Sequence, residues 1–81
     1  MELEEIKKRI EAGIPGATAH LSGDGCSCEA TVISDTFSDQ GLLAQQRAVM
    51  ATVNDLLVSG ELHALAIKTY TEQAWVDVQE G

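Results

Sequence analysis

Two cysteines and two histidines are the side chains of this 81-residue sequence best suited to soft-metal or thiol chemistry. Cys26 and Cys28 follow the turn-forming segment Gly23-Asp24-Gly25, and His63 lies 37 residues beyond Cys26. A thiolate together with an imidazole suits zinc or an iron-sulfur centre better than it suits magnesium or calcium. Cys26 and His63 are therefore candidate metal ligands, provided that the fold brings them together.

Each of these residues also has an ordinary structural interpretation. His63 could be an exposed residue at the start of a strand. Cys28 follows the alternation of the strand that contains it, which predicts a small buried side chain. Cys26 falls in the turn and is the better ligand, although a thiol redox sensor at this position is an alternative. His20 has no neighbour in the sequence that indicates chemistry, and we expect it to be structural or on the surface.

Apolar periodicity, turn residues and helix caps predict six elements in the order α-β-β-α-β-α. These are a helix over 3–14, strands over 17–22 and 28–35, a helix from about residue 41 to 59, a strand over 62–70, and a short final helix. Ser38 or Asp39 is expected to cap the long helix after a loop over 36–40, and Thr71 to cap the last one. Trp75, in that last helix, is expected to anchor the core.

The second strand, the long helix and the third strand form a β-α-β unit. Such crossovers join parallel strands in the great majority of cases, so both strands should begin at the same edge of the sheet. Adjacent strands lie about 4.8 Å apart. This topology predicts that Cys26 and His63 come close enough to share one ion.

Charge and length limit the classes of function. Thirteen acidic residues oppose five basic ones, giving a formal net charge of -8, which is unfavourable for binding phosphate backbones or anionic membranes. No apolar run approaches the roughly 18 residues of a membrane span. The acidic N-terminus lacks the positive charge of a signal peptide, so we expect a cytoplasmic protein with reduced cysteines. Sequence motifs of enzymes are absent, and a non-enzymatic binding protein is expected.

A resemblance to the BolA-like family rests on several segments. The most specific is Glu61-Leu62-His63-Ala64-Leu65, followed by Ile67-Lys68-Thr69-Tyr70-Thr71 and then Trp75. The segments around Gly23-Asp24-Gly25-Cys26, Glu29-Ala30-Thr31-Val32-Ile33-Ser34 and Phe37 are similar to the middle of the family's sequences. The resemblance spans residues 1–81 as one domain. It implies an α+β, KH-like (type II-like) fold with a three-stranded mixed sheet.

The resemblance also implies a function. Proteins of this family share a [2Fe-2S] cluster with a monothiol glutaredoxin and glutathione, in iron-sulfur trafficking and iron homeostasis. The family's ligand positions correspond to His63 and Cys26, with Cys28 as a conceivable substitute for Cys26. The alternative is a KH-like nucleic-acid-binding transcriptional regulator, which the charge disfavours. Whether the chain also forms a homodimer is left open by the sequence.

The sequence departs from the family pattern in two segments. Gln45 and Gln46 stand where family members usually carry basic residues at the start of the long helix, which further weakens a nucleic-acid role. Glu72 follows Thr71 where a proline is common, and its charge still favours a helix N-terminus. The ligand positions are unaffected by either departure.

Overall fold

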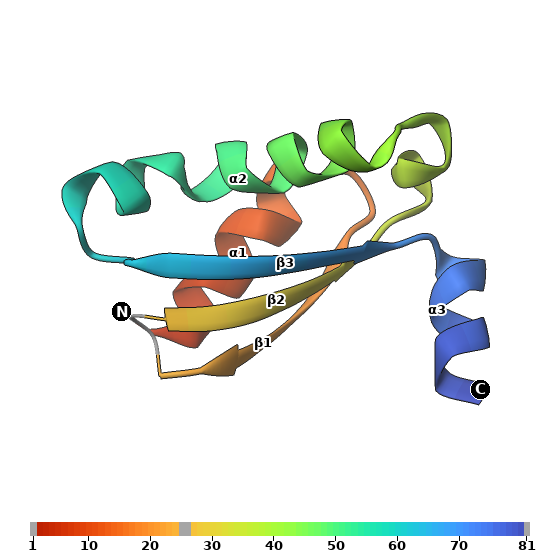
Figure 1. Ribbon diagram of the computed structural model, residues 1–81, viewed down its shortest axis with the longest axis horizontal. Coiled ribbons are helices and arrows are strands. Elements are labelled where there is room, and N and C mark those ends of the chain that lie inside the picture. Colours follow the sequence, from red (N-terminus) through yellow and green to blue (C-terminus); the bar gives the residue numbers. More distant parts are fainter. Residues whose placement is uncertain (1, 25–26, 81) are drawn as a thin grey trace.

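The computed structural model describes residues 2–24 and 27–80, and these form three α-helices, one 3₁₀ helix and a three-stranded sheet. In chain order the elements are α1 (Leu3–Gly13), β1 (Thr18–Gly23), β2 (Ser27–Ile33), η1 (Asp35–Asp39), α2 (Leu42–Ser59), β3 (Ala64–Tyr70) and α3 (Glu72–Glu80). Figure 1 shows α1 and α2 over the sheet, with α3 at the end of the sheet far from the β1–β2 connection. The predicted α-β-β-α-β-α order is confirmed.

The sheet is mixed, with β2 between the two other strands. β1 runs antiparallel to β2, and β3 runs parallel to it. The parallel register pairs Ser27 with Ala64 at one end and Ile33 with Tyr70 at the other. Because α2 joins the two parallel strands, the predicted crossover is confirmed, and β2 and β3 begin at the same end of the sheet.

The main core lies between the sheet and the helices α1 and α2. Alternate residues of β2 are buried on this side, including Cys28 as the alternation predicted. α1 contributes buried residues at helical spacing, and so does α2. The buried members of this core are Ile6, Ile10, Ile14, Ala19, Cys28, Ala30, Val32, Phe37, Val49, Val53, Leu56 and Leu62.

A second, smaller contact covers one end of the opposite face of the sheet. Trp75 of α3 stacks on His20 of β1 with ring centroids 5.7 Å apart, and its centroid lies 5.3 Å from that of Tyr70. Ile33 is buried but lies outside the main core cluster. The expectation that Trp75 anchors the main core is wrong, because α3 packs on the face that α1 and α2 leave open.

The connection between β2 and α2 is more regular than expected, since η1 replaces most of the predicted loop. The Ser34 hydroxyl accepts a hydrogen bond from the Thr36 amide at 3.2 Å, and so it caps η1. The same hydroxyl donates to the Pro15 carbonyl at 2.8 Å, which ties this turn to the segment after α1. A long-range contact therefore organises residues that look irregular in sequence.

The two expected helix caps have different outcomes. Thr71 caps α3 as predicted, because its hydroxyl accepts a hydrogen bond from the Ala74 amide at 3.2 Å. The prediction for α2 is wrong: the N-cap residue is Gly41, with no side-chain cap. Ser38 and Asp39 belong to η1. This helix ends at Asp39, and the extended residue Gln40 separates it from Gly41.

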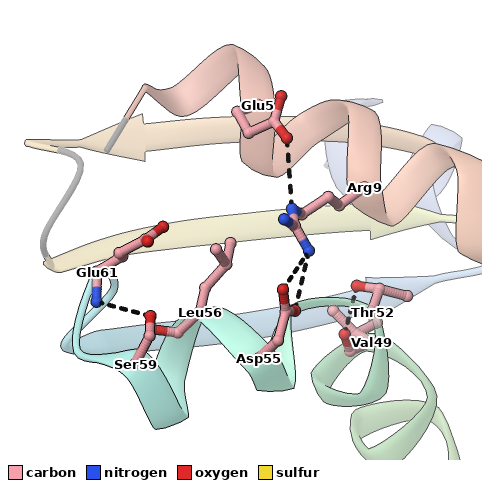
Figure 2. Close-up of polar contacts among 8 residues, drawn as sticks. All are labelled: Glu5, Arg9, Val49, Thr52, Asp55, Leu56, Ser59 and Glu61. Atoms are coloured by element: carbon pink, nitrogen blue, oxygen red, sulfur yellow. Dashed lines mark hydrogen bonds and ion pairs between the residues drawn. The ribbon is translucent and has the colours of Figure 1, made fainter.

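Besides their shared core, α1 and α2 are joined by an ion pair, which Figure 2 shows, and by a close approach at Gly13. The Arg9 Nη1 donates to both carboxylate oxygens of Asp55, at 2.9 and 2.8 Å, and its Nε lies 3.4 Å from Glu5 Oε1. Asp55 is largely exposed, so the pair adds little stability. Further along, a Cβ at Gly13 would lie 2.6 Å from Thr52 Cγ2. Close packing at Gly13 is therefore expected to affect the stability of the protein more than the ion pair between Arg9 and Asp55 does.

We predict that Gly13→Ala destabilises the protein, although alanine is the better helix former. Thr52 cannot easily move its methyl group, because its hydroxyl donates to the Val49 carbonyl at 2.7 Å. Overpacking of this kind costs about 1–3 kcal/mol. Urea unfolding followed by circular dichroism measures the loss, and Thr52→Ser, which removes the methyl and keeps the hydroxyl, should relieve it. An equal loss in both backgrounds would contradict the packing argument.

Candidate functional site

The candidate site lies at the end of the sheet where β2 and β3 begin. Ser27 pairs with Ala64 in the parallel ladder. His63 immediately precedes Ala64 in the sequence, and Cys26 immediately precedes Ser27. Cys26 lies outside the described residues, so its placement as a ligand stays a prediction. The described part of the site consists of the exposed His63 and the chain segments that lead into both strands.

His63 follows two anchored residues, Gly60 and Leu62, in the connection from α2 to β3, and it directly precedes β3. α2 ends at Gly60, whose φ of 84° is the left-handed conformation that glycine adopts at low cost. Leu62 is 1% exposed, and its amide donates to the Leu56 carbonyl at 3.1 Å, so β3 begins at Ala64 and not at Leu62 as predicted. Between them, the Glu61 amide donates to the Ser59 hydroxyl at 3.3 Å (Figure 2). An exposed imidazole therefore projects from a well-anchored segment.

The hairpin that leads into β2 is anchored on both described sides. Gly23 has a φ of 120°, and a Cβ there would lie 2.6 Å from the Ser27 carbonyl oxygen. The Asp24 Oδ1 accepts a hydrogen bond from the Ser27 amide at 2.9 Å, and the Asp24 amide donates to the Ser27 carbonyl at 3.4 Å. Asp24 and Ser27 are thus held together by hydrogen bonds, and Ser27 lies beside Ala64 at the start of β3.

Cys28 differs chemically from an exposed cysteine ligand. It is 9% exposed, belongs to the main core and pairs with Leu65 of β3. Burial raises the pKa of its thiol, and the nearby Asp24 carboxylate raises that pKa further. Metal ligation requires the thiolate, which a raised pKa disfavours near neutral pH. In this conformation Cys28 is suited to packing and not to binding an ion.

His20 lies away from this end of the sheet. It pairs with Thr31 of β2, four residues along the strand from Ser27, or about 13 Å at the rise of a strand. Its ring is exposed and stacked on Trp75. The expectation of a structural or surface role agrees with this position. His20 can therefore serve as a control for His63.

Gln45 and Gln46, which the sequence marks as departures from the family pattern, have structural roles that the sequence did not predict. The Gln45 amide nitrogen donates to the carbonyl oxygens of Phe37, at 3.1 Å, and Gln40, at 2.8 Å. The Gln46 amide nitrogen donates to the Ile67 carbonyl of β3 at 3.0 Å. Both glutamines therefore fix α2 to its neighbours. Their departure from the family's basic pattern was visible in the sequence, but their backbone partners were not.

Over residues 2–24 and 27–80, no group of three or more His, Cys, Asp or Glu side chains is arranged to hold a metal ion. In the same ranges, no helix has both the length and the apolar character needed to cross a membrane.

We predict that Gly23→Ser destabilises the hairpin strongly. The new side chain would require an unfavourable positive φ and would collide with the backbone of Ser27 and Cys28. Such strain costs about 1–3 kcal/mol. The matched control is Gly41→Ser, because Gly41 has a φ of -70°, open space around it, and the N-cap position where serine is favoured. Thermal unfolding should show a loss for the first variant and none for the second; equal effects would contradict this account.

We predict that the burial of Cys28 makes its contribution to stability depend on pH. Because the pKa of the folded thiol is raised, this contribution is complete below the unfolded pKa of about 8.5 and is lost as the pH rises through the folded-state pKa. Unfolding free energies of the parent protein and of Cys28→Ala, measured from neutral to alkaline pH, should therefore converge as the pH rises. A difference that stays constant or grows would contradict the raised pKa.

Comparisons with known proteins agree with this architecture. A family model described as BolA-like protein matches residues 8–74. The solved structure of a BolA protein homologue from Coxiella burnetii superposes with a TM-score of 0.83 and 32% identity, covering 94% of this chain and 97% of that one.

The chain is also similar to proteins of yeast and Escherichia coli. BolA-like protein 2 of Saccharomyces cerevisiae is 37% identical over 75 residues, covering 86% of this chain and 61% of the yeast protein. The acid stress protein IbaG of Escherichia coli K12 is 25% identical over 75 residues, covering 93% of this chain and 89% of IbaG. The match over residues 8–74 spans most of the chain, which therefore belongs to the BolA-like family.

Proposed function

We propose that this protein is a non-enzymatic cytoplasmic adaptor that shares a [2Fe-2S] cluster with a monothiol glutaredoxin and glutathione, and that His63 and Cys26 are its ligands. The observation that carries the proposal is the parallel pairing of Ser27 with Ala64. Each of these residues is the direct neighbour of one proposed ligand. The sequence neighbours of the two proposed ligands therefore lie on adjacent strands at one end of the sheet.

The described residues fit this role chemically. His63 is exposed, so its imidazole is accessible to a group held by another protein. Gly60 and Leu62 hold the chain beside His63 in place, so less conformational entropy is lost when the His63 imidazole binds a cluster. A [2Fe-2S] cluster takes four ligands, and some biological clusters combine thiolates with imidazoles. Two ligands from this chain leave the others to the partner and its glutathione.

Nucleic-acid binding is less well supported by the distribution of charge. Three of the five basic residues are engaged in ion pairs with acidic side chains: Lys7 with Glu11, Arg9 with Glu5 and Asp55, and Lys68 with Glu29. Non-specific affinity for nucleic acid depends on lysine and arginine neutralising phosphates. With a net charge of -8, the chain has few cations to offer. The adaptor function is therefore preferred to the transcriptional regulator.

We predict that His63→Ala causes the largest loss of the shared cluster, because a methyl group cannot replace an imidazole ligand. Cys26→Ala should weaken or rearrange the cluster. Cys28→Ala should mainly lower stability, at a cost of about 1 kcal/mol. The measurement is the visible absorption and circular dichroism of each variant, reconstituted with iron, sulfide, glutathione and a monothiol glutaredoxin.

The matched control is His20→Ala, which removes an exposed imidazole far from the strand starts and should leave the cluster spectrum unchanged. Melting of each variant alone separates loss of folding from loss of a ligand. A cluster spectrum unaffected by His63→Ala would overturn the ligand assignment. Failure of the parent protein to form a mixed complex with a monothiol glutaredoxin would overturn the proposed function as a whole.

A further inference from the structure

One flank of α2 forms an exposed, largely apolar groove that is separate from the residues around His63. Leu43 is 63% exposed and Met50 is 36% exposed. The groove, called the α2 groove below, is lined by Leu43, Gln46, Arg47, Met50, Ala51 and Asn54. These positions recur at steps of three and four residues, so they share one side of the helix.

The α2 groove lies on the side of α2 that faces away from α1. Successive residues of a helix turn by about 100°, which places Leu43 and Met50 on a different flank from Thr52 and Asp55, the residues near α1. Gln46, at the base of the groove, donates to the Ile67 carbonyl of β3. In the described sheet β3 is an edge strand that pairs with β2 alone. The groove therefore runs beside the edge of the sheet, on a helix fixed to that edge.

The charge around the α2 groove is opposite to that of the chain as a whole. The segment from Gly41 to Asn54 contains no Asp or Glu, although the sequence has thirteen such residues. Arg47 is the charged residue of the groove, and no carboxylate of the described chain forms an ion pair with it, in contrast to Arg9 and Lys68. The first turn of α2 also lacks acidic residues and a side-chain cap, so no carboxylate of that turn offsets the positive end of the helix dipole.

We propose that the α2 groove binds an acidic amphipathic helix of a partner protein. Apolar side chains of that helix would cover Leu43 and Met50, and a carboxylate would pair with Arg47. Grooves with spaced apolar anchors commonly bind amphipathic helices in this way. A basic helix would meet the positive charge of Arg47 and gain nothing from it.

A second copy of the chain is the less suitable occupant. In a two-fold symmetric dimer the same patch faces itself, so the Arg47 side chains of both copies would be enclosed in one interface. Like charges brought together in an interface disfavour association. The positive charge at the groove thus favours a different, acidic partner.

The test uses two designed amphipathic peptides of about 18 residues, long enough for helix formation to be measurable. Both carry the same leucine stripe; one has glutamate along its flanks and the other lysine. Titration into ¹⁵N-labelled protein, at low ionic strength and without cluster or glutaredoxin, should shift the amide signals of Leu43, Arg47, Met50 and Asn54 with the glutamate peptide. The lysine peptide should bind much more weakly.

Arg47→Glu should weaken the glutamate peptide about fivefold and should improve binding of the lysine peptide, as expected for reversing one partly exposed ion pair. The matched control is Lys8→Glu, which makes the same charge change at an exposed residue of α1 and should leave both affinities nearly unchanged. Met50→Ser should weaken the glutamate peptide without reversing the preference. Circular dichroism checks that each variant is folded.

Equal affinity for the two peptides, or signal shifts confined to other elements, would overturn the proposal. Sedimentation of the parent protein tests whether a second copy of the chain occupies the groove. Self-association that Arg47→Glu abolishes would assign the groove to a second copy, and it would also overturn the proposal of an acidic partner helix. Because the experiment needs neither iron nor glutaredoxin, its outcome is independent of the proposed cluster-sharing function.

Discussion

Parallel pairing of β2 with β3 is the interaction on which both the sheet and the candidate site depend. Parallel strands cannot be joined by a tight turn, so the chain must cross over through α2. The crossover is stabilised because α2 buries Val49, Val53 and Leu56 against the sheet. The first residues of β2 and β3, Ser27 and Ala64, are brought together at one end of the sheet by this packing. The site is thus a consequence of the core.

Backbone conformations then set where each of these strands begins. The positive φ of Gly60 ends α2, and the buried Leu62 directs the chain into β3, which leaves His63 exposed between the two. Gly23 does the same at the hairpin, where a side chain would collide with the following strand. The residues that position the proposed ligands therefore have no ligand chemistry of their own. A substitution at Gly23 or Leu62 can disturb the site while leaving every proposed ligand in place.

The sequence predicted the features that arise from local periodicity. The apolar stripe of α1, the alternation that buries Cys28 and the capping of α3 by Thr71 depend on residues a few positions apart, and the structure confirms all three. Features that depend on distant partners were missed. Ser34 organises η1 through the Pro15 carbonyl, 19 residues away, and Trp75 packs on the open face of the sheet because α1 and α2 already occupy the other. Cys26 and its role as a ligand remain a prediction from topology and resemblance.

The apolar residues of α2 illustrate a further limit of periodicity. Val49 and Val53 face the core, whereas Leu43 and Met50 are exposed on a flank, so the helix carries more apolar residues than its buried face requires. Periodicity identifies the buried face of α2. It does not identify Leu43 and Met50 as exposed, because the exposure of a side chain is known only once the packing of the helix is known. The same holds for Arg47, because only the structure shows that it lacks an ion pair in the described chain while Lys7, Arg9 and Lys68 have acidic partners. Neither the α2 groove nor His63 contributes a residue to the main core, so most of their side chains, Gln46 excepted, can change with little effect on the packing of the core.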